Sequence, residues 1–137
     1  MGAAYGLNTM APDFRERLAQ VTGGDGPDVV VEAVGSPATY RLAVDAVAFT
    51  GRVVCIGYSK SDVTFETRLF VQKELDIRGS RNAEPSDFRA VIRYMERGTC
   101  PVDTLVSSVT DWSGAQENLS RWSQNPGKVF RILLKTI

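Results

Sequence analysis

The sequence contains no histidine, and only two of its 137 residues are cysteines. Histidine is the commonest metal ligand and the commonest general base near neutral pH, so its absence removes both roles from this chain. Cys55 and Cys100 lie far apart and lack the paired spacing of a zinc site. The sequence therefore predicts no catalytic metal held by these residues, and it favours free thiols in a reducing, cytoplasmic setting.

The sequence also lacks an excess of charge and any long apolar run. Sixteen basic residues balance sixteen acidic residues, so the formal net charge is zero. A nucleic-acid surface needs basic excess to neutralise phosphates, and this balance argues against a nucleic-acid partner. No apolar run approaches the length of a membrane span, and no secretory signal precedes the first periodic segment. We therefore expect neither a nucleic acid nor a membrane as partner.

Three short apolar strands that end in glycine are the main feature that is present. Residues 28–33 are the clearest of them, because three consecutive valines precede a turn at residues 35–37. A strand buried on both faces of a parallel sheet has this composition. The same unit returns at residues 52–57 and 74–79. Ligands of open parallel sheets bind just outside the carboxyl ends of the strands, so the turns that follow them are candidate contacts.

The alternation of strands and helices predicts an α/β fold, with a partial, doubly wound parallel sheet of the Rossmann type. We expect helices on both faces of its three main strands. Residues 59–73 are less clear, because residues 63–65 fit a short extended piece and residues 69–71 fit either a helical turn or an edge strand. The other expected elements are short strands at 1–9, 106–109 and 128–134, and helices at about 12–22, 37–50, 85–97 and 111–123.

Two carboxylates, Asp28 and Glu32, flank the first of these strands. Their spacing of four residues places them on the same face of the strand but well apart. No partner base is visible near either of them. We therefore expect both carboxylates to be solvated at the strand ends rather than to form an acid–base pair.

Four motifs occur together in an order that resembles a known family. They are VTGGDGPDVVVEAVG at 21–35, GRVVCIG at 51–57, KELDIRGSRN at 73–82 and NPGKV at 125–129. Together they resemble the second half of the coenzyme domain of medium-chain, zinc-dependent alcohol dehydrogenases, and most of all polyol, threonine and sugar-acid dehydrogenases. The resemblance covers essentially the whole chain. It implies NAD(P)-dependent oxidation of a secondary alcohol on a polyol or sugar acid.

The resemblance also implies how the chain is divided. Residues 1–100 correspond to a partial NAD(P)-binding Rossmann domain, with the second mononucleotide half only. Residues 101–137 correspond to a C-terminal segment that returns to the catalytic domain in relatives. In the family the zinc ligands, the Gly-x-Gly-x-x-Gly turn for the pyrophosphate and the acidic residue for the adenosine ribose lie upstream. None of these occurs here, so we expect a C-terminal fragment that is inactive alone, binds NAD or NADP weakly or not at all, and leaves zinc to the upstream domain.

The family pattern implies cofactor contacts at three turns and in the last strand. The implied contacts are Val34, Gly35, Ser36, Ile56, Gly57, Tyr58, Gly79, Ser80, Arg81 and Arg131. Gly57 would allow close approach of the nicotinamide ring because it has no Cβ. Arg131 would offer a forked, permanently charged donor to the pyrophosphate. Simpler interpretations stay open: Ser36 can begin a helix, Gly57 can end a strand, and both arginines can be solvated charges.

Three assemblies remain open at this point. The chain can be part of a dehydrogenase, one subunit of a split enzyme whose catalytic domain is a separate polypeptide, or a non-catalytic, self-associating remnant. We expect a homo-oligomer in any case, because the strands at 28–33 and 74–79 would each present an unpaired edge. Relatives in the family commonly dimerise through the second of these regions.

Overall fold

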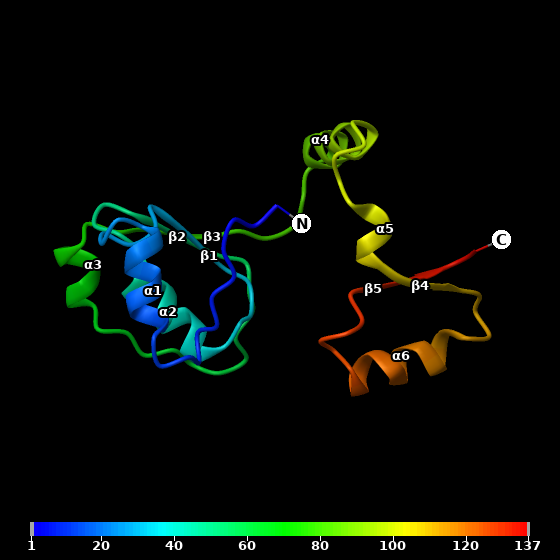
Figure 1. Cartoon of the computed structure of the whole chain (residues 1–137), viewed down its shortest axis with the longest axis horizontal. Helices are drawn as coiled ribbons and strands as arrows, with labels where there is room; N and C mark the ends of the chain where they lie inside the picture. Colours follow the sequence, from blue (N-terminus) through cyan, green and yellow to red (C-terminus); the bar gives the residue numbers. More distant parts are fainter. Residues whose placement is uncertain (1, 137) are drawn as a thin grey trace. The chain divides into compact units, whose positions relative to one another are not determined.

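The computed structural model describes residues 2–136 and forms two compact units. One unit comprises residues 3–82, and the other comprises residues 83–136 together with residue 2. Figure 1 shows the order of the helices and strands along the chain. The domain division expected at residue 100 stays a prediction. Within residues 2–136, no helix is both long enough and apolar enough to cross a membrane.

A three-stranded parallel sheet with the order β1-β2-β3 forms the centre of the first unit. Its strands are β1 (Val29–Glu32), β2 (Arg52–Cys55) and β3 (Asp76–Gly79). Val53 in the middle strand lies opposite Val30 on one side and Ile77 on the other. The predicted parallel sheet of three strands is therefore confirmed, and the partial Rossmann fold with it.

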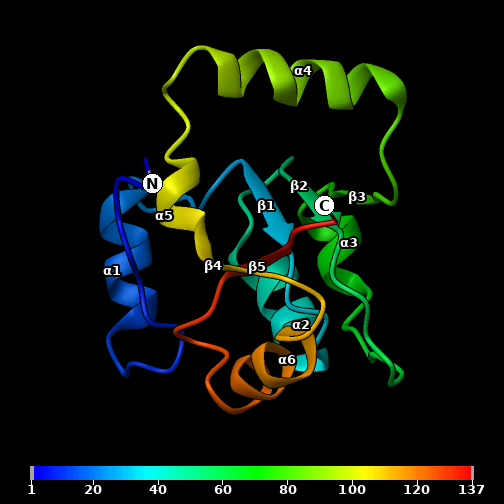
Figure 2. The ribbon, with the colours of Figure 1, turned by 90° about the vertical axis from the view of Figure 1, so that its right-hand side faces the viewer.

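The helices of the first unit are α1 (Phe14–Val21), α2 (Pro37–Ala46) and α3 (Arg68–Gln72). α2 packs against β1 and β2 (Figure 2). Its Ala43 and Val47 are buried together with Val53 of β2, and Val30 packs against this cluster. Of the two structures that fitted residues 69–71, the helical turn is the one that forms, as α3, and residues 63–65 form no strand.

The opposite face of the sheet carries charged and partly exposed side chains. Val29 and Val31 point to this face and are 53 % and 56 % exposed. Beside them Asp76 pairs with Arg52 at 2.8 Å and with Arg78 at 2.9 Å. The expected cover of helices on both faces is therefore not seen at these two valines. The three consecutive valines predicted cover on both faces, but among the described residues no helix covers Val29 and Val31.

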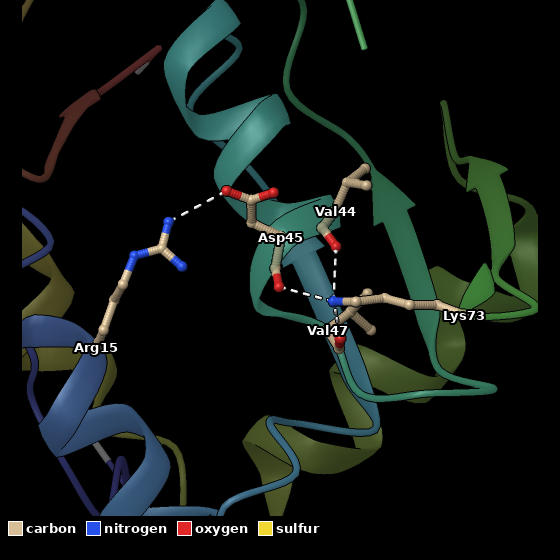
Figure 3. A network of polar contacts seen from close by, with 5 residues as sticks. All are labelled: Arg15, Val44, Asp45, Val47 and Lys73. Atoms are coloured by element: carbon tan, nitrogen blue, oxygen red, sulfur yellow. Dashed lines mark hydrogen bonds and ion pairs between the residues drawn. The ribbon is translucent and has the colours of Figure 1, made fainter. Parts of the chain in front are cut away.

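A lysine holds the carboxyl end of α2 (Figure 3). Lys73 Nζ donates hydrogen bonds to the carbonyl oxygens of Val44, Asp45 and Val47 at 3.3, 2.8 and 2.8 Å. Carbonyls in the last turn of a helix lack partners within the helix, and a cation there also complements the helix dipole. Arg15 of α1 forms an ion pair of 3.2 Å with the Asp45 carboxylate, so α1 is tied to the same turn.

The second unit contains a two-stranded parallel sheet and three helices. Its elements are α4 (Pro85–Glu96), α5 (Val102–Leu105), β4 (Val106–Thr110), α6 (Ala115–Gln124) and β5 (Arg131–Leu134). β4 pairs with β5. The last strand begins later than expected because Lys128 N donates to Asn125 O at 3.0 Å and closes a turn. The last helix also begins later, because the Asp111 carboxylate accepts from Gly114 N at 3.1 Å in a preceding turn.

The strand expected at residues 1–9 is wrong for the residues that the structure describes. Residues 2–9 contain no strand, and Tyr5 is 66 % exposed. Instead Asn8 turns the chain, because its side-chain oxygen accepts from Met10 N at 3.0 Å. An extended segment needs a neighbouring strand for its backbone groups, and no described strand pairs with this one.

Candidate functional site

The three predicted turns, at residues 34–36, 56–58 and 79–81, lie at the carboxyl edge of the first sheet. Ser80 N donates to Cys55 O at 3.0 Å, which ties the third turn to the end of β2. The first and second turns are packed against each other even more closely. A Cβ at Gly35 would lie 2.6 Å from both N and O of Tyr58. The parallel register thus brings together backbone from three turns that are far apart in the sequence.

A hollow of about 610 Å³ lies where the second and third turns meet. The lining residues are Tyr40, Cys55, Ile56, Gly57, Tyr58, Gly79, Ser80 and Arg81. Six of these eight belong to the predicted contacts, whereas Tyr40 and Cys55 do not. The backbone at Gly79 is open, since a Cβ there would meet no atom within 4 Å. A flat ring could therefore approach this edge.

The Glu32 carboxylate organises the first turn, contrary to the expectation that it is solvated. Glu32 as a whole is 3 % exposed. Its Oε1 accepts hydrogen bonds from Val34 N at 3.0 Å, Gly35 N at 2.8 Å and Thr39 Oγ1 at 2.7 Å. The chain passes from β1 almost directly into α2, so the backbone of the turn closes over the carboxylate. The prediction of a solvated strand end was wrong for this reason.

The second carboxylate oxygen has a different environment. Glu32 Oε2 is buried and has no hydrogen-bond partner among the described residues. It lies against Gly57, where a Cβ would overlap it and also the backbone of Gly35. Glycine at 57 is thus required by protein atoms.

Tyr40 is the other side chain that sequence reasoning missed. It lies in the first turns of α2 and donates from its hydroxyl to Gly57 O at 2.7 Å. The helix is well fixed there, because Thr39 N donates to Ser36 Oγ at 3.2 Å. Ser36 therefore begins the helix, as one interpretation of the sequence proposed, and its cofactor contact stays a prediction. A tyrosine early in a helix beside glycine-ended strands was the signal that could have pointed to this contact.

Three neighbouring groups have perturbed acidities. Burial works to raise the pKa of Glu32, but the hydrogen bonds from Thr39, Gly35 and Val34 outweigh it and hold that pKa below its ordinary value. Burial, and then the nearby negative charge of Glu32, raise the pKa of the Cys55 thiol. Burial, helped by Cys55 and Glu32, also raises the pKa of Tyr40, so its hydroxyl keeps the proton that it donates. The thiol is accordingly not an activated nucleophile.

The predicted basic contacts are in different units. Arg81 lines the hollow and is exposed. Arg131 lies in β5, in register with Val106 of β4, and is also exposed. The predicted contact of Arg131 with a pyrophosphate stays a prediction.

The donor set of the chain does not fit a zinc ion. Residues 2–136 contain no group of three or more histidine, cysteine, aspartate or glutamate side chains that could hold a metal. At the hollow the Tyr40 hydroxyl and the N–H groups of Gly57 and Ser80 already donate within the chain, and the Arg81 guanidinium is exposed.

A family model described as zinc-binding dehydrogenase matches residues 1–97. The chain belongs to this family. Among curated relatives it is 24 % identical to a sorbitol dehydrogenase of Halalkalibacterium halodurans over 141 residues, covering 100 % of the chain and 40 % of that protein. It is 33 % identical to an L-galactonate-5-dehydrogenase of Escherichia coli over 101 residues, covering 74 % and 30 % respectively. The chain thus spans two fifths or less of the length of these relatives.

Solved structures of alcohol dehydrogenases share the fold of the chain. An alcohol dehydrogenase from a Thermus species superposes with a TM-score of 0.87 at 24 % identity, over 98 % of this chain and 39 % of that one. A structure from Escherichia coli described as a short chain alcohol dehydrogenase with NADH gives a TM-score of 0.86 at 22 % identity. The superposition covers 98 % of this chain and 39 % of that one. These likenesses confirm the Rossmann-type fold.

Proposed function

We propose that this chain supplies the nicotinamide side of an NAD(P) site in a zinc-dependent dehydrogenase that oxidises a secondary alcohol of a polyol or sugar acid. The observation that carries this proposal is that the second and third turns line one hollow at the carboxyl edge of the sheet, while the first turn packs against the second. The names of the sorbitol and galactonate relatives support the substrate class.

The residues at the hollow have distinct roles in this proposal. NAD(P), when bound, supplies the chemistry by accepting a hydride from the alcohol carbon. The backbone at Gly79, where a Cβ would meet no atom within 4 Å, offers a surface that a flat ring can approach closely. The exposed ring of Tyr58 and the cation of Arg81 border the hollow.

The zinc and pyrophosphate functions are proposed to lie outside these 137 residues. The chain has neither histidine nor a Gly-x-Gly-x-x-Gly turn. Without backbone N–H groups at a helix start to bind the pyrophosphate, cofactor affinity of these residues alone should be weak. We therefore propose that a separate domain or polypeptide completes the enzyme, and a partner that co-purifies would support the second of these arrangements.

A titration and an activity assay test this proposal together. Calorimetry with NADH should give a dissociation constant near or above roughly 1 mM, which corresponds to about 4 kcal/mol. With NAD or NADP, added zinc and threonine, sorbitol or sugar acids, the chain alone should show no turnover. Micromolar binding would contradict the missing pyrophosphate site, and zinc-dependent reduction of either cofactor would contradict the missing catalytic domain.

A non-catalytic, self-associating role is the second candidate. The observation that favours it is the partly exposed apolar face at Val29 and Val31 of β1, a strand that pairs on one side alone among residues 2–136. A stable oligomer that shows no binding of NADH up to several times the expected millimolar constant would favour this role over the first.

A further inference from the structure

Gly57 is held on three sides by protein groups, and two of the residues that hold it, Glu32 and Tyr40, are outside the predicted contacts. Its N–H donates to the backbone oxygen of Glu32 at 2.9 Å, and its carbonyl accepts from the Tyr40 hydroxyl at 2.7 Å. The space on its Cβ side is filled by Glu32 Oε2 and the backbone of Gly35. The turn cannot move into the hollow or away from it without breaking one of these contacts.

Both side chains that hold the turn are themselves fixed. Tyr40 stands in α2, whose first turn is capped by reciprocal hydrogen bonds between Ser36 and Thr39 at 3.2 Å. Glu32 is locked by three donors to one oxygen, while its other oxygen stays buried without a partner. An uncompensated buried oxygen costs free energy, and such groups concentrate at functional sites.

We propose that Tyr40 and Glu32 are positioning residues, which hold the turn at 56–58 in the conformation that receives the nicotinamide ring. This inference rests on the proposed function. Tyr40 itself lines the hollow, and its hydroxyl links α2 to the backbone of Gly57. A backbone that is already ordered loses less conformational entropy when a ligand binds. Loosening the turn should therefore weaken binding without unfolding the protein.

Tyr40→Phe is the sharpest test, because it removes one hydroxyl and keeps the ring. Tyr94→Phe is the matched control, since Tyr94 lies in α4 of the other unit and is 49 % exposed. Amide hydrogen exchange measured by NMR should be about tenfold faster at Gly57 in Tyr40→Phe, because the loss of the bond to the Gly57 carbonyl lets the turn open more often and frees the Gly57 N–H from Glu32 O. Exchange at Val53, in the core of β2, should stay within about twofold of the unsubstituted chain.

NADH binding, followed in the same spectra up to about 10 mM, gives the functional readout. The dissociation constant should rise about fivefold or more in Tyr40→Phe and stay unchanged in Tyr94→Phe. Unchanged exchange at Gly57 would overturn the inference. Faster exchange with unchanged NADH binding would also overturn it, because Tyr40 would then be structural only. Absence of NADH binding by the unsubstituted chain would overturn the proposed function, and the positioning role with it.

Discussion

At the scale of single residues, the carboxylate of Glu32 connects β1, the first turn and α2. Its Oε1 accepts two backbone N–H groups and one hydroxyl, and these donors stabilise the ionised form. The pKa of Glu32 in the folded chain therefore lies below its unfolded value of about 4.3, although burial opposes this. The stabilisation is fully present above the unfolded pKa and is lost as the pH falls through the folded pKa.

Glu32→Gln should lower the free energy of unfolding by about 1–3 kcal/mol at pH 7. The amide keeps one acceptor but places a donor where Oε2 now lies without a partner. The deficit relative to the unsubstituted chain should shrink below about pH 4, as the native carboxylate becomes protonated. Urea unfolding of both proteins at pH 7 and pH 3.5 measures this deficit. Glu96→Gln, at an exposed position of α4, is the control. A deficit that does not change with pH would contradict the prediction.

Gly35 offers a second test at this scale. Gly35 and Gly23 both have positive φ, at 78° and 69°, but a Cβ at Gly23 would meet no atom within 4 Å. Gly23→Ala should therefore cost about 1–2 kcal/mol for the left-handed backbone alone. Gly35→Ala adds a clash with the Tyr58 backbone and should cost at least about 3 kcal/mol. Equal losses of unfolding free energy for the two variants, measured by urea unfolding, would show that the turns at 34–36 and 56–58 are not packed against each other as described.

At the scale of elements, α2 is the helix that the site depends on most. Its first turns carry Tyr40, its Ala43 is buried in the core with Val47 just beyond its end, and that end is capped by Lys73. The cap comes from the segment between α3 and β3, which is far away in the sequence. α2 is thus fixed at both ends, and its Tyr40 contacts the second turn directly at Gly57 O.

Lys73→Met should destabilise the chain by about 1–2 kcal/mol, because carbonyls at the end of α2 lose a cationic donor. The methionine keeps the apolar stem, so the change reports on the ammonium group. Lys60→Met, in an exposed loop, is the matched control and should change stability by less than about 0.5 kcal/mol. Thermal unfolding followed by circular dichroism checks both. A similar small effect of the two substitutions would argue against the cap shown in Figure 3.

At the scale of the whole molecule, the first sheet has two outer strands. β1 and β3 each pair on one side alone within the described chain, and Val29 and Val31 stay more than half exposed. Apolar side chains are exposed in the second unit as well. They are Phe88, Val91 and Ile92 on α4, which are each more than half exposed. Unpaired edges and exposed apolar side chains both favour association with another chain.

Self-association is therefore expected for the purified chain. Light scattering coupled to size exclusion, run over a dilution series, should report a mass at least twice that of one chain at high concentration. Substitution of Val30 by lysine cannot serve as a test, because Val30 packs against the core of the same unit. A compact, monodisperse monomer at every concentration, with cooperative thermal unfolding, would contradict the prediction.

The local pattern was sufficient for most of the first unit. Three short runs followed by glycine turns predicted β1, β2 and β3, because the valines at 29–31 and 53–54 and the alternating Leu75 and Ile77 fit strands of a parallel sheet. Pro37 after Ser36 predicted the start of α2 for an equally local reason, a capped first turn. The same reasoning failed at residues 2–9, since an extended segment forms a strand only where another strand is free to pair with it.

The sequence by itself determined the fold class, the three turns and the family, because these depend on short motifs and their order. Only the tertiary structure decided what surrounds those turns. The burial of Glu32, the hydrogen bond from Tyr40 to Gly57 and the cap by Lys73 join residues 7 to 29 positions apart. Such contacts depend on the strand register and on how α2 lies against the sheet. Neither can be predicted from the residues that neighbour Glu32, Tyr40 or Lys73 in the sequence.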